Sequence, residues 1–259
     1  MKQIFFILFL SVISVCASAT ESTIAKADSA YTHDDFILAS KLYTKAIDTE
    51  GSSVLLYYNL GNTYYRMGKL GKAIVYYERA LRLDPTNEDA RTNLEFVNTK
   101  ITDQVGDNGM FISNTFDKLI DYLHPNSWGW LAVISFLLFI IAIAVYVFAP
   151  GIIIKKTGFF GAIILLIVSL ISNIFAYKAA GKATSHNHAI VIEPATILST
   201  SPRLPKDRSE EALLLHEGTK VEIIDSVTSS VDSIPTKWYD VKVDNSHRAW
   251  INSSSIEKI

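Results

Sequence analysis

The residue types that carry most enzyme chemistry are present in this sequence, but they are not spaced as a catalytic site. There is no Ser-His-Asp set, no paired-carboxylate motif, no glycine-rich phosphate loop and no ligand spacing typical of zinc. His186 and His188 stand close together in the chain, but two histidines supply too few ligands for a metal site. We therefore expect no enzyme activity, no cofactor and no bound metal.

Three side chains are instead spaced for binding. Tyr58, Asn62 and Arg66 recur every four residues, so on a helix they share one face, opposite Leu60 and Tyr64. Aromatic and arginine side chains supply much of the energy of protein interfaces. The formal net charge is −2 and there is no basic patch, so we expect a protein or peptide partner and no nucleic acid.

The helix that carries these side chains belongs to a longer pattern over residues 54–87. Gly61 and Ala73 are small, which lets two antiparallel helices approach closely. Asp84-Pro85 ends the second helix, because a residue before proline avoids the α region. The pattern resembles a tetratricopeptide repeat. Its motif residues are Tyr57, Leu60, Gly61, Tyr64, Ala73, Tyr77, Ala80 and Pro85.

Moving this pattern back by its period of 34 residues predicts a degenerate first repeat at about 20–53. Ala39, Tyr43 and Ala46 then stand where the central repeat has alanine, tyrosine and alanine. Residues 88–101 begin a third unit that does not complete, and we expect them to form a capping helix. Such repeats bury a continuous core only by stacking, so two repeats and a cap are near the minimum.

The resemblance to tetratricopeptide repeats implies a peptide-binding groove lined by the first helix of each pair. The resemblance implies a partner-binding groove formed by Tyr58, Asn59, Asn62, Tyr65, Arg66, Asn93 and Lys100. Asn62 and Asn93 stand where some family members hold a peptide carboxylate. Tyr58 replaces the lysine that those members also use, which argues against carboxylate capture. The alternative is that Asn62 and Arg66 form an ordinary solvated face.

Two apolar runs follow the repeats, at residues 128–149 and 158–177. Each is long enough to cross about 30 Å of hydrocarbon at about 1.5 Å per residue. Helices that are apolar all round need amphipathic partners inside a soluble core, and the sequence offers none. We expect a transmembrane hairpin, with residues 150–157 as a cytoplasmic loop that carries Lys155 and Lys156.

The N-terminus is typical of an exported protein. Lys2, an apolar run and a closing Ala-Ser-Ala predict a signal peptide at residues 1–19, with a buried N-terminal helix as the alternative. Lipidation at Cys16 is not expected, because the preceding Val15 is β-branched. Export places both soluble domains in the periplasm, with the hairpin in the inner membrane, and agrees with the positive-inside rule.

From residue 189 the pattern changes to short β-like runs, with alternation at Tyr239, Val241 and Val243. Residues 189–259 resemble a bacterial SH3-like barrel. The segments that carry the likeness are 213–223, 238–243 and 249–251. The resemblance implies a ligand-binding domain, with Trp238 as the candidate at a groove edge.

The order of all these segments resembles the BatE-type proteins of the Bat aerotolerance group. That resemblance implies a membrane-anchored adaptor whose partners are sister Bat proteins with von Willebrand-type domains and a MoxR-type ATPase. The alternative is a cell-wall anchor whose SH3-like domain binds peptidoglycan peptides. The expected fold is a multidomain membrane protein with an all-α repeat domain, a two-helix hairpin and an all-β barrel. After the signal peptide we expect the repeat domain at 20–103, a linker at 104–127, membrane spans at 128–149 and 158–177, a second linker at 178–188 and the SH3-like domain at 189–259.

Overall fold

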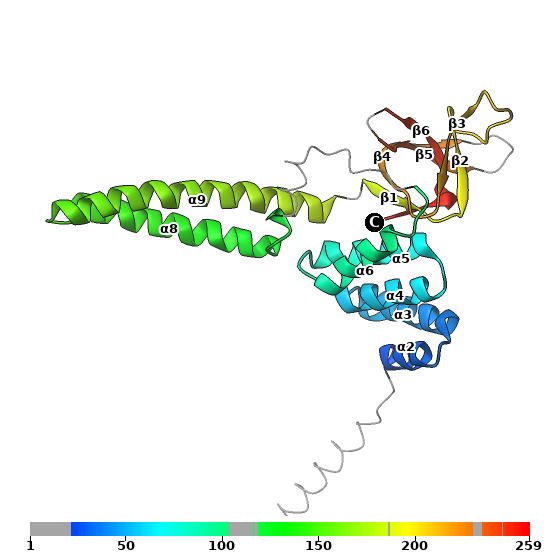
Figure 1. Cartoon of the computed structure of the whole chain (residues 1–259), viewed down its shortest axis with the longest axis horizontal. Helices are drawn as coiled ribbons and strands as arrows, with labels where there is room; N and C mark the ends of the chain where they lie inside the picture. The colour runs from blue at the N-terminus through cyan, green and yellow to red at the C-terminus, as the bar shows by residue number, and fades with distance from the viewer. Residues whose placement is uncertain (1–21, 104–115, 117–118, 186, 230–234, 245) are drawn as a thin grey trace, which may run out of the picture. The chain divides into compact units, whose positions relative to one another are not determined.

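The computed structural model describes residues 22–103, 116, 119–185, 187–229, 235–244 and 246–259. The signal peptide expected at 1–19, with Cys16, and most of the linker expected at 104–127 lie outside the described residues. The chain divides into two units, Met1–Ser52 and Ser53–Ile259. Helices come first along the chain, then two long helices, then a sheet (Figure 1).

The first unit contains one helical hairpin, α2 (Thr23–Thr32) and α3 (Phe36–Glu50). Ser22 caps α2 by accepting a hydrogen bond from the Ala25 amide at 3.1 Å, as serine does at helix starts. The small residues of the hairpin seam are fully buried, namely Ala27, Ala39 and Ala46. The Tyr43 hydroxyl donates to Asp28 at 2.6 Å and ties the two helices together.

The second unit begins with a similar hairpin, α4 (Val54–Arg66) and α5 (Leu70–Leu83). Gly61 lies against Tyr77, because a Cβ added to Gly61 would stand 2.7 Å from the Tyr77 ring. The Tyr77 hydroxyl donates to Asn62 Oδ1 at 2.7 Å. This bond joins the two residues that lie 34 positions after Tyr43 and Asp28. The same helical hairpin therefore occurs twice along the chain.

The capping helix is α6 (Glu88–Asn98). Asn87 Oδ1 accepts a hydrogen bond from the Ala90 amide at 2.8 Å, and Glu88 and Asp89 occupy the first turn. Carboxylates there are stabilised by the helix dipole. The helix ends three residues before the boundary expected at 101, since Asn98 is its last helical residue.

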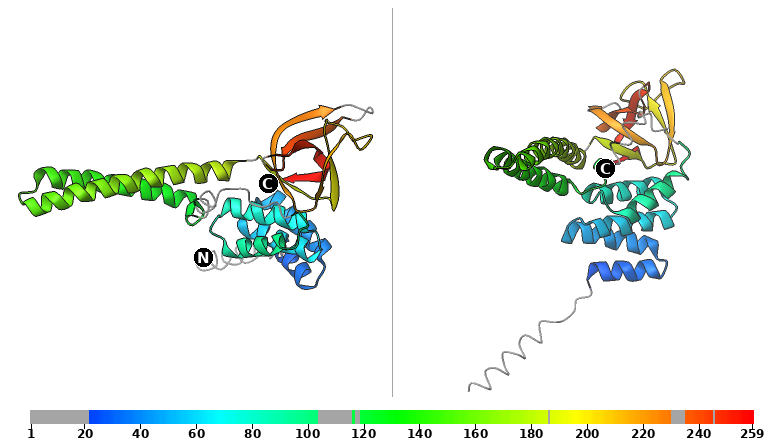
Figure 2. Two further views of the ribbon diagram at one scale, coloured as in Figure 1. Left: turned by 45° about the horizontal axis from the view of Figure 1, so that its top comes forward. Right: turned by 60° about the vertical axis from the view of Figure 1, so that its left-hand side comes forward.

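Two long helices follow, α8 (Pro125–Phe148) and α9 (Ile152–Thr184), and they lie side by side (Figures 1 and 2). Both are long and apolar enough to cross a membrane, and only 11% and 22% of their apolar windows are buried. Ser169 Oγ donates to the Ala132 carbonyl at 3.1 Å. A Cβ on Gly158 would stand 2.9 Å from the Tyr146 nitrogen. Small buried residues such as Ala132, Ala162 and Ser169 line the seam, Trp128 packs edge-on to Phe175 at one end of it, and most of the other large apolar side chains are exposed.

The connection between the two long helices is shorter than expected. The loop expected at 150–157 is reduced to three residues, since α8 ends at Phe148 and α9 begins at Ile152. Pro150 and Gly151 interrupt the helix, and nothing after them does, so Lys155 and Lys156 lie in the first turns of α9. At its other end α9 continues to Thr184, through much of the linker expected at 178–188.

The C-terminal part forms one antiparallel sheet of seven strands. The strands are β1 (His188–Val191), β2 (Ala195–Ser199), β3 (Glu211–His216), β4 (Lys220–Ser229), β5 (Thr236–Lys242), β6 (Arg248–Asn252) and β7 (Ile256–Lys258). Their order is β3-β2-β6-β5-β4-β1-β7. The end strands β3 and β7 do not pair with each other in the described residues, so the sheet is open. This corrects the closed barrel that the SH3-like resemblance implies.

The sheet encloses its own apolar core even without closure. Val191, Leu198, Val241 and Ile251 are fully buried and belong to one cluster. The register between β4 and β5 shifts between Ile223 and Asp225, and such shifts bend a strand. We refer to this sheet and its turns, residues 187–259, as the β domain.

Candidate functional site

Three of the predicted groove residues form one hydrogen-bonded cluster. Asn93 on α6 donates from Nδ2 to Asn62 Oδ1 at 2.9 Å and lies 3.3 Å from the Tyr58 hydroxyl, both on α4. Asn62 Oδ1 also accepts from Tyr77. The four side chains are at least partly buried, where a hydrogen bond costs more to break than at the surface. The cluster therefore holds α4 and α6 at a fixed separation.

Two further groove residues meet around a phenylalanine that the sequence analysis did not select. The Tyr65 ring packs edge-on to Phe96, with centroids 5.9 Å apart. Lys100 Nζ lies 4.5 Å from the Phe96 ring centroid and 5.5 Å from that of Tyr65. Phe96 is 52% exposed. Aromatic rings under a cation at the surface suit a partner with exposed apolar and acidic groups.

The other two predicted groove residues lie on α4. Asn59 is half-buried, and its carbonyl accepts a hydrogen bond from Thr63 at 2.7 Å. Arg66 is exposed in the last turn of the helix. We refer to the predicted groove residues together with Phe96 as the α4–α6 face. It consists of Tyr58, Asn59, Asn62, Tyr65 and Arg66 on α4, Asn93 and Phe96 on α6, and Lys100 just after α6.

The repeat-motif residues occupy the seam between α4 and α5. Leu60, Gly61, Ala73, Tyr77 and Ala80 are buried. Tyr57, Tyr64 and Pro85 are half-buried. Tyr64 stacks on Tyr76 with centroids 5.3 Å apart, and Tyr57 lies 6.1 Å from the same ring. Burial raises the pKa of Tyr76 above its ordinary value, and the nearby Glu257 carboxylate adds to the effect.

A second interface, which was not predicted from the sequence, joins α5 to the β domain. Ile74 on α5 shares one apolar cluster with Ile190 and Ile259. At the start of α5, the Gly71 amide donates to Glu217 Oε1 at 2.8 Å. A Cβ on Gly71 would stand 2.5 Å from the Val191 carbonyl oxygen. Only glycine allows this close approach, so the contact is tightly packed.

Ion pairs surround this apolar contact. Arg79 Nη1 lies 2.8 Å from Glu257 Oε1, and Lys220 Nζ lies 2.7 Å from Glu78 Oε1. Arg79 also donates to the Lys258 carbonyl at 2.6 Å. Partly exposed pairs contribute little stability individually, but they define how the β domain is oriented on α5. In each pair one charge belongs to α5 and the opposite charge belongs to the β domain. Such complementary charges favour one orientation of the β domain over others.

Asp103, which follows α6, forms a third link to the β domain. Its carboxylate accepts from the His216 amide at 2.6 Å, lies 2.8 Å from His216 Nδ1 and accepts from Thr219 Oγ1 at 2.9 Å. Burial raises the pKa of Asp103, but the hydrogen bonds from His216 and Thr219 outweigh burial and hold it below its ordinary value. The ionised carboxylate is therefore the form that the folded protein stabilises.

Trp238 was the candidate ligand residue of the β domain. In the structure it is 3% exposed, so it offers almost no surface to a ligand. Trp250 on β6 is half-buried. The alternation that predicted one inward face for β5 was incomplete, because Trp238 and Asp240 are buried together with Tyr239 and Val241.

Comparison with known proteins bears on the repeat. The family model described as Tetratricopeptide repeat matches residues 54–87. Over 76 residues the chain is 30% identical to the Protein SGT1 homolog of Oryza sativa subsp. japonica. The aligned stretch covers 29% of this chain and 21% of that protein. The chain thus spans about a fifth of the length of that relative. Residues 54–87 form a tetratricopeptide repeat, as the motif predicted.

Proposed function

We propose that this protein is a non-catalytic, membrane-anchored adaptor whose α4–α6 face binds a protein or peptide partner. The observation that carries the proposal is that the β domain covers one repeat helix and leaves side chains of the others exposed. The β domain contacts α5 through Gly71, Ile74 and Arg79, whereas Arg66, Phe96 and Lys100 on the α4–α6 face stay exposed. Tetratricopeptide repeats suggest a role in protein–protein interaction.

Membrane anchoring rests on α8 and α9. A pair of core helices in a soluble protein would be mostly buried, whereas most of each apolar window here is exposed, and exposed apolar surface of this extent marks a membrane or protein contact. The repeat precedes the hairpin and the β domain follows it, yet the two are in contact through α5. That contact requires both to lie on one side of the membrane, as a two-pass hairpin arranges.

The finer assignment follows the order of segments. A signal peptide, repeats, a membrane hairpin and a β domain together resemble the BatE-type proteins. We accordingly propose an inner-membrane location with both domains facing the periplasm. The partners would be sister Bat proteins with von Willebrand-type domains and a MoxR-type ATPase, in a complex for aerotolerance or envelope stress.

Co-purification tests the proposed face. The tagged full chain is purified from mildly solubilised membranes as parent and as the double variant Arg66→Ala, Phe96→Ala, and the co-purifying proteins are identified by mass spectrometry. Loss of an arginine and an aromatic anchor should weaken binding by about 2 kcal/mol or more, roughly 30-fold.

Leu83→Ala is the matched control, because Leu83 is an exposed apolar residue of α5 outside the α4–α6 face. It should retain the partners. Full retention by the double variant would show that the α4–α6 face is an ordinary solvated surface.

A further inference from the structure

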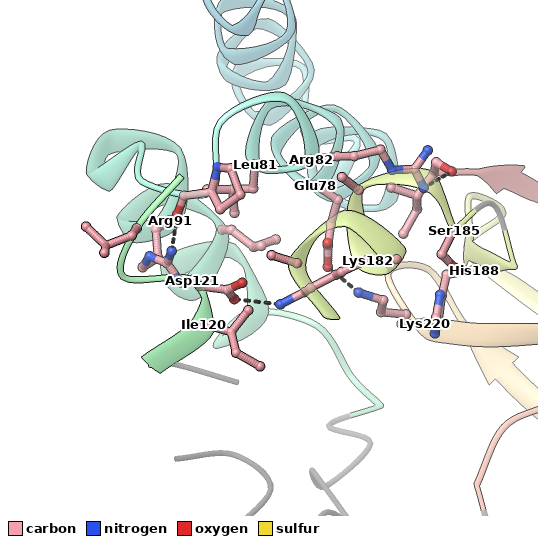
Figure 3. Close-up of a pocket in the computed structure, with 17 residues that line it drawn as sticks. Glu78, Leu81, Arg82, Arg91, Ile120, Asp121, Lys182, Ser185, His188 and Lys220 are labelled. Atoms are coloured by element: carbon pink, nitrogen blue, oxygen red, sulfur yellow. Dashed lines mark hydrogen bonds and ion pairs between the residues drawn. The ribbon is translucent and has the colours of Figure 1, made fainter. Parts of the chain in front are cut away.

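A cavity of about 570 Å³ lies where the repeat helices, the end of α9 and the β domain meet (Figure 3). Glu78 and Arg82 reach it from α5, Arg91 from α6, Lys182 from α9 and Lys220 from β4. Asp121, in the segment before α8, also lines it and is bound to Lys182. Its lining therefore combines residues of the repeat, of α9 and of the β domain, and nothing in the adaptor role uses it.

The charged lining is predominantly positive. Among the described lining residues the lysines and arginines are Arg82, Arg91, Lys182 and Lys220, and the acids are Glu78 and Asp121. Lys182 Nζ lies 2.5 Å from Asp121 Oδ2 and Lys220 Nζ lies 2.7 Å from Glu78 Oε1. Both acids are thus engaged. Arg82 donates to the backbone oxygen of Ile259, and Arg91 donates to the Pro85 carbonyl. Neither of these two bonds is to an acidic side chain, so the side chains of the lining carry four positive and two negative charges.

Two titratable groups on the lining have pKa values below their ordinary ones. Burial lowers the pKa of Arg82, and the neighbouring Arg79 lowers it further. Burial likewise lowers the pKa of His188, and the Lys220 ammonium adds to that effect. In both cases a nearby cation makes the positive form less favourable. An anion in the cavity would relieve that repulsion.

The rest of the lining is apolar, and the cavity lies near the membrane surface. Its apolar side chains are Leu81, Leu94, Ile120, Leu123, Ala179, Ala183 and Ile259. With 33 residues, α9 is about 50 Å long, some 20 Å more than the hydrocarbon layer. Trp130 and Tyr177 are 68% and 83% exposed near the same end of the hairpin as Lys182, where interfacial aromatics mark the headgroup level.

We propose that this cavity binds an anionic phospholipid, with the phosphate between Arg82, Arg91, Lys182 and Lys220 and the first acyl carbons on the apolar lining. A phosphate attached to an apolar tail satisfies both parts of the lining, whereas a free phosphate would leave the apolar part unused. Arginine and lysine are the usual phosphate ligands. The proposal rests on membrane spanning by α8 and α9, but not on the α4–α6 face, so the two can fail separately.

Calorimetric titration of the detergent-solubilised full chain tests this. The probes are dihexanoyl phosphatidylglycerol, its zwitterionic counterpart dihexanoyl phosphatidylcholine, and inorganic phosphate. The parent should bind phosphatidylglycerol about tenfold more tightly than either of the others. Equal affinity for the two lipids would refute the charge selection. Inorganic phosphate binding as tightly as phosphatidylglycerol would show that the ligand is a soluble phosphate instead.

Two variants and one control locate the binding. The double variant Lys182→Gln, Lys220→Gln removes two cations and should lose about tenfold in affinity for phosphatidylglycerol. Ala183→Phe fills the cavity without changing a charge, and should weaken phosphatidylglycerol binding to a similar degree. Lys178→Gln, one turn from Lys182 on α9 but outside the lining, should bind as the parent does. Parental affinity in both the double variant and Ala183→Phe would exclude the cavity as the site.

Discussion

The Glu217 carboxylate caps helix α5, with its Oε1 2.8 Å from the Gly71 amide nitrogen across 146 residues of sequence. The first amides of a helix have no partner within the helix, and Lys69 at the N-cap of α5 supplies no side-chain hydrogen bond. A negative group there is also favoured by the helix dipole. The β domain thus completes a repeat helix that the repeat itself leaves uncapped.

We expect Glu217→Ala to loosen the start of α5. Loss of a helix cap costs about 0.5–2 kcal/mol, and hydrogen exchange should accelerate at the amides of residues 70–73 in the full chain. Glu211→Ala, at an exposed carboxylate of β3, is the control and should leave those amides protected. Unchanged exchange in Glu217→Ala would mean that the cap contributes nothing to the stability of α5.

Asp103 makes the docking of the β domain dependent on pH. Its pKa lies below the ordinary value, so its stabilising effect is present above the unfolded pKa of about 3.9 and is lost as pH falls through the lower, folded pKa. We expect Asp103→Asn to lower the free energy of unfolding at pH 7 by about 1–2 kcal/mol. The gap between variant and parent should close below about pH 4.

Urea unfolding of the solubilised full chain between pH 7 and pH 3 measures this gap. Asp48→Asn, at an exposed carboxylate of α3, should follow the parent at every pH. If the stability of Asp103→Asn instead falls in parallel with the parent below pH 4, the carboxylate is not the titrating group.

Gly61 is expected to tolerate no side chain. A Cβ there would stand 2.7 Å from the Tyr77 ring, and Tyr77 is held by its bond to Asn62, so the helices must separate. Gly61→Leu should destabilise the repeat by about 1–3 kcal/mol, as in other overpacked cores. Gly129→Ala meets no atom within 4 Å and should leave the melting temperature unchanged. Equal melting of the two variants in the full chain would contradict the close approach of α4 and α5.

The repeat could be predicted from the sequence because its determinants are local. Gly61, Ala73 and Tyr77 are placed by helix periodicity within 34 residues, and each position of the motif has one packing reason. The hairpin was predictable for the same reason, since a long apolar run requires no partner to be recognised. Its turn was placed too late, because Lys155 and Lys156 suggested a loop where the helix had already begun.

The interface between α5 and the β domain could not be predicted. Asp103 and His216 lie 113 residues apart, and nothing about an aspartate after a helix or a histidine after a leucine run indicates the other. No predicted segment covered β2, because it is only five residues long, and its pairing with β3 and β6 is not visible in the sequence. Trp238 was misplaced because alternation assumes that only one face of a strand is buried, and β5 is buried on both.

The arrangement of the two domains leads to a prediction about membrane topology. If α8 and α9 span the membrane as proposed, the contact between α5 and the β domain predicts that both lie on one side of it, with the connection between α8 and α9 on the other. Cysteines introduced at Thr92 on α6, Thr228 on β4 and Thr157 near the start of α9 report on these positions, and all three residues are exposed. In spheroplasts an impermeant thiol reagent should label the first two and spare the third.

Labelling of Thr157→Cys alone would keep the domains together but reverse the proposed periplasmic orientation, because Lys155 and Lys156 would then face outward against the positive-inside rule. Labelling of only one of Thr92→Cys and Thr228→Cys would separate the domains across the membrane and contradict both the hairpin and the contact through α5.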